Sequence, residues 1–340
     1  MAEFVTPKGF QDNWRPPAGS RVLQPQRPAP SGSGRADQSR LARIARRAPE
    51  AMVKITGRKR DGAHVQSHLE YISRNGKLEL EENTGERVGG RSGVRELGDR
   101  WDDANQADVE RRRTGSAAIS MILSMPAGTD PDRLREAARA FAHHTFSENY
   151  DYVMALHTDV KHPHVHLTVR TAGHDGRPLN PRKADLDAWR QSFARELRAR
   201  GIEAEATPRR ARGKVQKAER GPIRQMRDRG VTPQTVRSAH LEVGQELTGR
   251  KKIPTRPWEE NIVRRQQTIR QTYLATAGAL ALSPDAEDRR LAEDVRKFVA
   301  GMPPIETRRH AIAREMGPEL RKEFGRGLDR SPDRDSGRSR

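Results

Sequence analysis

The chain has 340 residues and a formal net charge of +19, from 65 Lys and Arg against 46 Asp and Glu, so a polyanion is the first partner to consider. A hydrophobic fraction of 33% and an aromatic fraction of 4% are too low for a close-packed core along the whole chain, which indicates one compact domain with loosely ordered basic flanks. The lack of Cys excludes disulfides, thiolate zinc sites and cysteine nucleophiles. With no membrane-span-length apolar stretch and no signal peptide, we expect a cytoplasmic, bacterial protein.

The basic charge is unevenly distributed. Basic and acidic side chains number nine and four in residues 1–50, 25 and 22 in 51–200, and 31 and 20 in 201–340. Pro, Gly, Ser and Arg dominate the beginning of the chain, and Arg, Asp and Ser dominate its end. We therefore predict four regions: a disordered basic arm (1–50), a folded domain (51–225), a helical basic region (226–322) and a disordered Arg-rich tail (323–340).

Apolar periodicity and capping residues predict the elements along the chain. A strand over 51–55 precedes a helix over 64–75, for which Gly76 provides the C-terminal cap, and a short strand end follows at 77–80. Residues 81–113 are polar and Gly-rich. The remaining predicted elements are a strand over 117–125, a helix starting at Asp130 and Pro131, a strand pair at 152–156 and 165–171, and helices over 185–200, 233–247, 258–280 and 284–298.

Four of the eleven histidines fall within ten residues, at 157, 162, 164 and 166. On a strand, His164 and His166 point to the same face because side chains alternate with a period of two. A turn through 159–163 would return the preceding strand, which ends at His157, to their side. Three imidazoles around one point can hold a metal ion with an open coordination position. The alternatives are a His-rich surface loop without function, and the alternating His162, His164 and His166 of a histidine-triad nucleotide hydrolase.

A metal-bound phosphate would need a nucleophile, and without Cys the candidates are Ser, Thr, Tyr or water. The chain has four tyrosines. Tyr71 lies off the apolar stripe of the first predicted helix, so its hydroxyl is expected to face a cleft, although a structural role stays open. Tyr150 and Tyr152 begin a strand, where packing is the ordinary explanation.

Three ordered motifs resemble those of plasmid relaxases, the mobilisation nucleases. They are HLEYISRNGKLEL at 68–80, SMPAGTD at 124–130 and HTDVKHPHVH at 157–166, and the similarity includes the relaxase that nicks T-DNA borders. The likeness covers about residues 50–225, with ERGPI at 219–223 near its end. One departure is Lys161, which stands where the border relaxase has an acidic residue.

The resemblance implies an α+β fold of the histidine-hydrophobic-histidine endonuclease type, with an antiparallel sheet and flanking helices, over 51–225. It makes Tyr71 the nucleophile that attacks a phosphodiester at a transfer origin and stays joined to the 5′ phosphate. Because only one tyrosine matches the first motif, a two-tyrosine cycle is not expected. His157, His164 and His166 become ligands of Mg²⁺ or Mn²⁺, and Asp159 orients a ligand or accepts the phenolic proton. The residues expected to contact DNA are Arg74, Lys77, Ser124 and His162.

The leading hypothesis is therefore a metal-dependent DNA relaxase that nicks and rejoins single-stranded DNA at a transfer origin. Its expected partners are accessory relaxosome proteins and a type IV secretion coupling protein, and the Arg-rich tail is a candidate export signal with which the protein would pass into the recipient cell. The alternatives are a histidine-triad nucleotide hydrolase and a non-catalytic basic DNA-binding accessory protein. If the flanks supply only affinity, deletion of 231–340 should leave nicking intact.

Overall fold

The structure is a computed structural model that describes residues 34–108, 115–216, 219, 221–249 and 256–328. The chain divides into two compact units. The first holds the described residues up to Thr207 together with Thr276–Phe298, and the second holds Pro208–Ala275 with the described residues from Val299 onward. His157, His164, His166 and Tyr71 all belong to the first unit, which is therefore the part that positions the candidate site.

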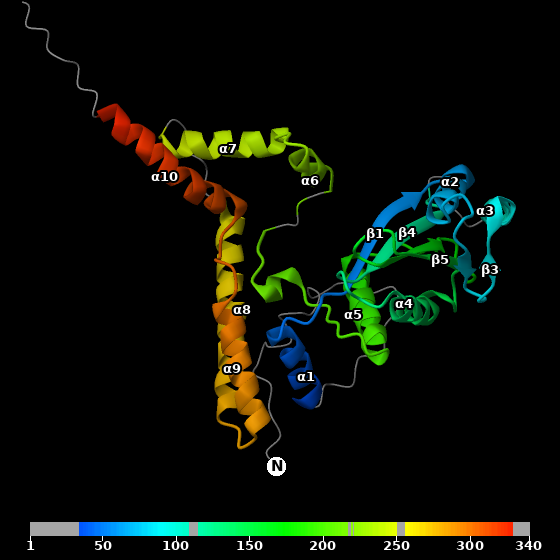
Figure 1. The fold of residues 1–340 in the computed structure, drawn as a ribbon, viewed down its shortest axis with the longest axis horizontal. Helices are drawn as coiled ribbons and strands as arrows, with labels where there is room; N and C mark the ends of the chain where they lie inside the picture. The colour runs from blue at the N-terminus through cyan, green and yellow to red at the C-terminus, as the bar shows by residue number, and fades with distance from the viewer. Residues whose placement is uncertain (1–33, 109–114, 217–218, 220, 250–255, 329–340) are drawn as a thin grey trace, which may run out of the picture. The chain divides into compact units, whose positions relative to one another are not determined.

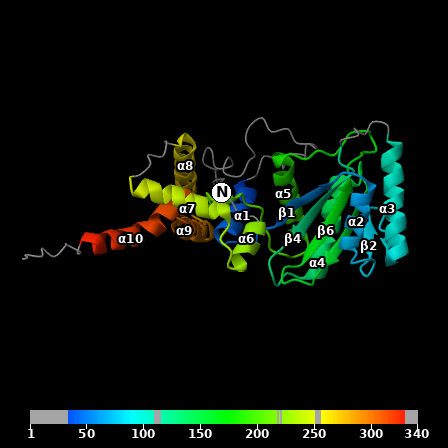
Figure 2. The same ribbon diagram turned by 90° about the horizontal axis from the view of Figure 1, so that it is seen from above.

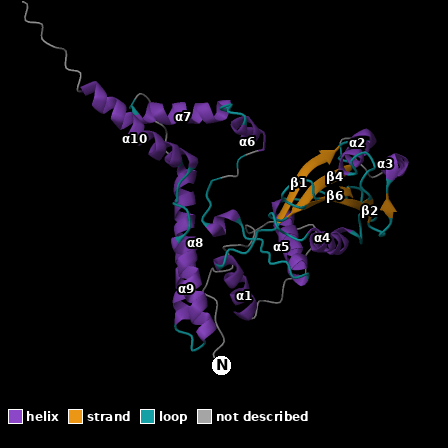
Figure 3. Ribbon diagram, viewed as in Figure 1, coloured by secondary structure: helices purple, strands orange, loops and turns teal. Residues whose placement is uncertain are grey.

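Six strands of the described chain form one sheet in the first unit, and every neighbouring pair is antiparallel (Figures 1 and 3). The order across the sheet is β1-β4-β6-β5-β2-β3, so β6 and β5 are central. With helices packed on the sheet, this is the expected α+β class. The strands are β1 (Met52–Lys59), β2 (Leu80–Glu82), β3 (Arg87–Val88), β4 (Ala118–Ser124), β5 (Tyr152–His157) and β6 (His164–Arg170).

Helices cover both faces of the sheet (Figure 2). On one face, α4 (Pro131–Phe146) and α5 (Lys183–Ala199) pack on a large apolar core. On the other face, α2 (Gly62–Ile72) and α3 (Gly90–Ala107) enclose a smaller core against part of the sheet. The alternation of each strand therefore sends one set of side chains into the large core and the other set toward α2.

Local sequence explains where these helices begin. The Asp130 side chain accepts hydrogen bonds from the backbone N–H groups of Asp132 and Arg133, and Pro131 occupies the first turn, as predicted. The Asp61 carboxylate caps α2 by accepting from the N–H of His64. Both caps satisfy backbone donors that have no partner inside the helix.

The end of α2 is more sharply defined than predicted. Arg74, Asn75 and Gly76 follow one another with φ of 53°, 57° and 80°. Only at Gly76 is there also no space for a side chain, because a Cβ atom there would lie 2.6 Å from the backbone nitrogen of Arg91. The predicted helix end is therefore wrong by three residues: α2 ends at Ile72 with Ser73 as its C-cap, and Gly76 is the last residue of a left-handed turn that starts at Arg74.

Two helices of the first unit fall where the sequence indicated none. Helix α1 (Gly34–Ala45) lies within the stretch predicted as a disordered arm, so that prediction is wrong for residues 34–45, while residues 1–33 lie outside the described chain. The side chains of Leu41 and Ile44, on one side of α1, are buried. Helix α3 forms within the polar stretch 81–113 because its few apolar side chains share one buried stripe, made of Val94, Leu97 and Trp101.

A helix from the C-terminal third belongs to the first unit. Helix α9 (Ala286–Ala300) buries Leu291 and Val295. Hydrogen bonds join it to α1, from Gln38 to Asp288 at 3.3 Å and from Arg46 to Asp294 at 3.2 Å. The predicted boundary at residue 225 therefore leaves out a helix that contacts the N-terminal part of this unit.

The second unit is helical, in agreement with the predicted helical region. Its elements are η2 (Arg209–Arg212), α6 (Gly221–Asp228), α7 (Gln234–Leu247), α10 (Arg308–Leu328) and most of α8 (Pro257–Ala281). Arg309 pairs with Glu246 and, at 3.4 Å, with Glu259. Helix α10 continues to residue 328, so the tail predicted to be disordered from 323 is helical over its first residues, and 329–340 lie outside the described chain. No helix among the described residues is long and apolar enough to cross a membrane.

Candidate active site

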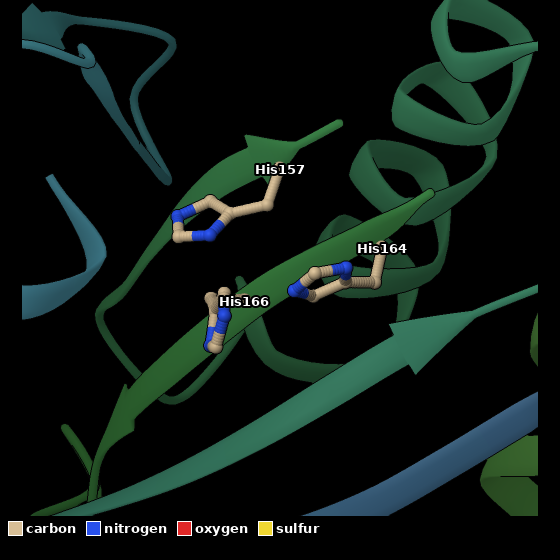
Figure 4. Close-up of side chains that lie close together, drawn as sticks. All are labelled: His157, His164 and His166. Atoms are coloured by element: carbon tan, nitrogen blue, oxygen red, sulfur yellow. The ribbon is translucent and has the colours of Figure 1, made fainter. Parts of the chain in front are cut away.

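Three histidines converge where β5 ends and β6 begins (Figure 4). His157 and His164 are direct cross-strand neighbours, and His166 follows two residues along β6 on the same face. The ring centroids lie 4.4 Å apart for His157 and His166, 5.3 Å for His157 and His164, and 5.0 Å for His164 and His166. One nitrogen from each ring lies within 4.8 Å of the others. The strand alternation and the turn therefore bring together the three imidazoles that the sequence predicted.

Hydrogen bonds assign the nitrogens of this cluster. Nε2 of His157 lies 2.7 Å from the carbonyl oxygen of Ile72, and Nδ1 of His164 lies 3.1 Å from that of His162. Because a carbonyl oxygen can only accept, both nitrogens donate, which leaves Nδ1 of His157 and Nε2 of His164 as free lone pairs. Nδ1 of His166 is buried and has no hydrogen-bond partner in the described structure. Imidazoles fixed by a carbonyl on one nitrogen and unpaired on the other suit a metal ion.

Burial disfavours the charged form of His157 and His166. Desolvation, followed by the charges of His157 and His164, lowers the pKa of His166 to about 3. Burial is also the main cause that lowers the pKa of His157, while its bond to Ile72 acts in the opposite direction. Neutral imidazole is the form that donates a lone pair to a cation, so the site is prepared for a metal at neutral pH.

Tyr71 presents its phenol to this cluster from α2. The side chain is 66% exposed, and its ring centroid lies 5.8 Å from that of His166 in an edge-to-face arrangement. His68, one helical turn earlier, stacks on Tyr71 at 6.2 Å, and its Nε2 lies 3.1 Å from the hydroxyl oxygen of Thr168 on β6. The expectation that Tyr71 lies off the apolar stripe is confirmed.

The other tyrosines are packing residues. Tyr150, Tyr152 and Tyr273 are 7%, 3% and 0% exposed. Burial raises the pKa of Tyr152 to about 12, because the charged phenolate would lose its water. A nucleophile must meet a substrate from solvent, so Tyr71 is the tyrosine whose position suits that role.

Asp159 contacts the end of α2. Its carboxylate lies 2.6 Å from the guanidinium of Arg74 and 3.9 Å from Nδ1 of His157. The hydrogen bond from Arg74 is the main reason that the pKa of Asp159 lies below its ordinary value. A carboxylate stabilised in this way is ionised and weakly basic, so the arrangement suits a link between the loop after β5 and the end of α2 better than the uptake of a proton.

The residues expected to contact DNA occupy different environments. Lys77 and His162 are exposed, and Arg74 is engaged with Asp159. Ser124 lies directly opposite His164 across β4 and β6 but is buried, with its hydroxyl 3.4 Å from the carbonyl oxygen of Pro163. That contact gives Ser124 a structural role in holding the turn between β5 and β6.

Sequence reasoning missed the contacts that position the site. No role was predicted for His68 beyond its place in the first motif, although its spacing of three residues from Tyr71 places both on one helical face. The carbonyl of Ile72 and the hydroxyl of Thr168 had no sequence signal, because their partners lie 85 and 100 residues away in the chain.

Comparison with known proteins gives a consistent result. Residues 71–202 match the family described as Relaxase, MobA/VirD2-like, nuclease domain. Proteins described as T-DNA border endonuclease VirD2 are 33% identical over 167 residues in Rhizobium radiobacter and 33% over 169 residues in Rhizobium rhizogenes. A further relative from Agrobacterium fabrum is 32% identical over 169 residues. Each alignment covers 44% of this chain and 37–39% of the relative, so the chain spans about two fifths of the relatives' length.

Proposed function

We propose that this chain, whose residues 71–202 form a nuclease domain of the MobA/VirD2-like relaxase type, nicks and rejoins single-stranded DNA at a transfer origin. One observation carries the proposal: the exposed phenol of Tyr71, on the adjacent helix α2, lies beside a cluster of three convergent imidazoles. The relatives are described as border endonucleases, which supports a DNA phosphodiester as the substrate.

The proposed step is a transesterification. The phenolic oxygen of Tyr71 forms a bond to the phosphorus, and the bond from phosphorus to the 3′ oxygen breaks. The phenolic proton passes to a base or water, the leaving oxygen takes up a proton, and a free 3′ hydroxyl results. The product is a 5′-phosphotyrosine that keeps the energy of the original ester, so the reverse step rejoins the strand without a nucleotide cofactor.

His157, His164 and His166 would hold a divalent cation, Mg²⁺ or Mn²⁺, through Nδ1 of His157, Nε2 of His164 and the unpaired Nδ1 of His166. Such an ion, when bound, withdraws charge from the non-bridging oxygens of the phosphate. The protein supplies the positions: His68 packs against the phenol, the carbonyl oxygen of Ile72 orients His157, and Asp159 pairs with Arg74 at the end of α2.

A histidine-triad nucleotide hydrolase is a poorer fit. That mechanism requires a nucleophilic imidazole within an alternating run on one strand. Here His162 is exposed in the turn, its carbonyl oxygen accepts from His164, and the third ring of the cluster comes from β5. A non-catalytic DNA-binding role leaves the exposed phenol and the unpaired buried nitrogen unexplained.

The wider setting also belongs to the proposal. We place the protein in the bacterial cytoplasm, acting with accessory relaxosome proteins and a type IV secretion coupling protein during plasmid or element mobilisation. The relaxase type of the nuclease domain supports this setting. Export of the protein with its DNA would use the Arg-rich end of the chain, most of which lies outside the described residues.

The test uses supercoiled plasmid that carries the DNA flanking the gene, incubated with the full chain and Mn²⁺ or Mg²⁺. The proposal predicts a nicked circle with protein attached to the 5′ end, and loss of nicking with EDTA. Primer extension then locates the nick. Nicking that continues in EDTA would contradict the metal-dependent mechanism, and DNA binding without any nick would favour an accessory protein.

A further inference from the structure

The sheet face that carries the histidines is only half covered. Helix α2 and its partner α3 pack over β5 and the adjoining strands, where Val153 and Ala155 are buried. At the Met52 end of β1 the same face is open to solvent: Met52 is 44% exposed, Lys54 is exposed and Ile122 is partly exposed. A strand of DNA that brings a phosphate to the histidines therefore has its free surface on the β4 and β1 side.

The strand register aligns this open surface with the site. One row across the sheet runs from His157 through His164 and Ser124 to Met52. The next row runs from His166 through Ile122 to Lys54. Directly opposed residues in antiparallel strands share a face, so Met52, Lys54 and Ile122 point to the same side of the sheet as the histidines.

The distances suit neighbouring nucleotides. Strands lie about 4.8 Å apart, so the backbone at Lys54 is about 10 Å from that at His166, two strands away. Stacked nucleotides rise about 3.4 Å each, so this gap corresponds to about three nucleotides of a stacked strand and fewer of an extended one. The long Lys54 side chain can shorten the gap further.

The chemistry of the open surface suits single-stranded DNA. Among the described residues no carboxylate pairs with Lys54, so its ammonium is available to an anion. Neither row contains an acidic side chain. Met52 and Ile122 flank Lys54 with apolar surface on which a sugar or base can pack. Arg58 is on the same strand but on the other face of the sheet, because it lies opposite Ile119, whose side chain enters the large core. Arg58 donates a hydrogen bond of 3.1 Å to Asn180.

We propose that Lys54 binds a backbone phosphate about one to three nucleotides from the scissile one, and that Met52 and Ile122 form the apolar surface under the intervening part of the strand. This inference rests on the proposed nicking activity. It makes Lys54 a positioning residue, which sets how the strand enters the site without touching the reacting atoms. A side chain with this role changes binding and its salt dependence more than the rate of the bound complex.

The experiment uses the full chain and an oligonucleotide that spans the nick located for the wild-type protein. Lys54→Gln should raise the half-saturating oligonucleotide concentration by roughly three- to tenfold and flatten the slope of log affinity against log salt by about 0.7, the value for one contact to single-stranded DNA. The single-turnover rate at saturation should stay unchanged. Lys54→Arg should restore most of the affinity, and Arg58→Gln, on the same strand and the opposite face, should behave as the wild type.

A series of oligonucleotides with one methylphosphonate each then identifies the contact. Neutralising the phosphate that Lys54 binds should weaken the wild type and leave Lys54→Gln unaffected, whereas neutralising any other phosphate should affect both equally. The inference is overturned if Lys54→Gln keeps the wild-type affinity and salt slope, or if its defect is the same for every modified phosphate. If the wild-type protein makes no nick at all, the proposed function fails first, and the two failures are thereby distinguished.

The apolar part of the surface has its own test. Met52→Ser should weaken binding of the unmodified oligonucleotide, and an abasic site at the nucleotide over Met52 should remove the difference between the variant and the wild type. A defect in Met52→Ser that persists with an abasic site at each position in turn would show that Met52 contacts no base.

Discussion

Nε2 of His157 donates a hydrogen bond of 2.7 Å to the main-chain carbonyl oxygen of Ile72, the residue that directly follows Tyr71. This bond ties a metal-binding candidate on β5 to the last turn of the helix that carries the proposed nucleophile. A second tie, between Arg74 and Asp159, joins the next turn of chain to the loop after β5. The position of the phenol relative to the imidazoles is therefore fixed by contacts at the end of α2.

Metal binding should accordingly stiffen the end of α2. Hydrogen exchange of the Ser73 and Asn75 amides, which bond to Leu69 and Glu70, should slow when Mg²⁺ is added. In His157→Ala this slowing should disappear and the affinity for Mn²⁺ should fall by about tenfold or more. His144→Ala removes an exposed histidine on α4 and should change neither measurement. Slowing that persists in His157→Ala would show that the bond to Ile72 does not couple the two parts.

The pair of Arg74 and Asp159 should matter for activity more than for stability. Both side chains are about half exposed, and ion pairs of that kind contribute about 0–1 kcal/mol to the free energy of unfolding. We expect Asp159→Asn and Arg74→Ala each to slow nicking while the melting temperature moves by only a few degrees. In a double-mutant cycle of the nicking rate, the double variant should be little slower than either single one, whereas multiplied defects would mean that the two residues act independently.

Gly76 should be essential for the geometry of the α2 end. Gly85→Ala places a Cβ atom in open space at a φ of 87° and should cost about 1 kcal/mol of unfolding free energy from backbone strain alone. Gly76→Ala has a similar φ of 80° but also collides with the backbone of Gly90, so we expect a cost of about 2–4 kcal/mol. Denaturant unfolding compares the two, and Gly76→Ala should also lose nicking. Equal costs would contradict the close approach.

Stability should fall on acidification. Burial, followed by the charge of Lys59, lowers the pKa of His68 to about 4, against about 6.5 for an unfolded chain. His68 in the unfolded chain therefore takes up a proton as the pH falls below 6.5, whereas His68 in the folded chain takes it up only near pH 4. This contribution to stability is complete above pH 6.5 and is lost as the pH falls toward 4. Melting temperatures in EDTA should decline over that window, and less so in His68→Asn. An equal decline in both proteins would contradict the assignment.

Helix α9 should not be separable from the nuclease domain in the way the sequence predicted. The hydrogen bonds between α1 and α9 place Ala286–Ala300 with the first unit. Deletion of 231–340 should therefore lower the melting temperature of the nuclease domain, whereas deletion of 301–340, which keeps α9, should lower it less. Identical melting temperatures for the two deletions would show that α9 adds nothing to this unit.

The sequence was informative where the signal is local. The alternation at His164 and His166, the Asp130 and Pro131 start of α4 and the left-handed conformation of Gly76 all depend on neighbours within a few residues. Helix α3 was missed because its buried stripe is only three large apolar residues in a polar, Gly-rich stretch. Helix α1 was missed because it follows a segment rich in Pro and Gly and depends on packing against residues far along the chain.

The candidate site likewise has a part that could be predicted from local sequence and a part that could not. Its residue types and their spacing in the chain were visible, since catalysis needs particular side chains. The contacts that orient them were not, because Ile72 acts through its backbone and Thr168 through a distant histidine. The open sheet face beside Lys54 likewise depends on strand register, which no local pattern determines.

Mass spectrometry of the covalent complex tests the central claim most directly. The full chain is incubated with Mn²⁺ and the oligonucleotide that spans its nick, the complex is digested with protease and nuclease, and the modified peptide is sequenced. The account predicts one adduct, a 5′ nucleotide phosphate on Tyr71, that is absent from Tyr71→Phe and retained in Tyr150→Phe. An adduct on any other side chain, or one that persists in Tyr71→Phe, would contradict it.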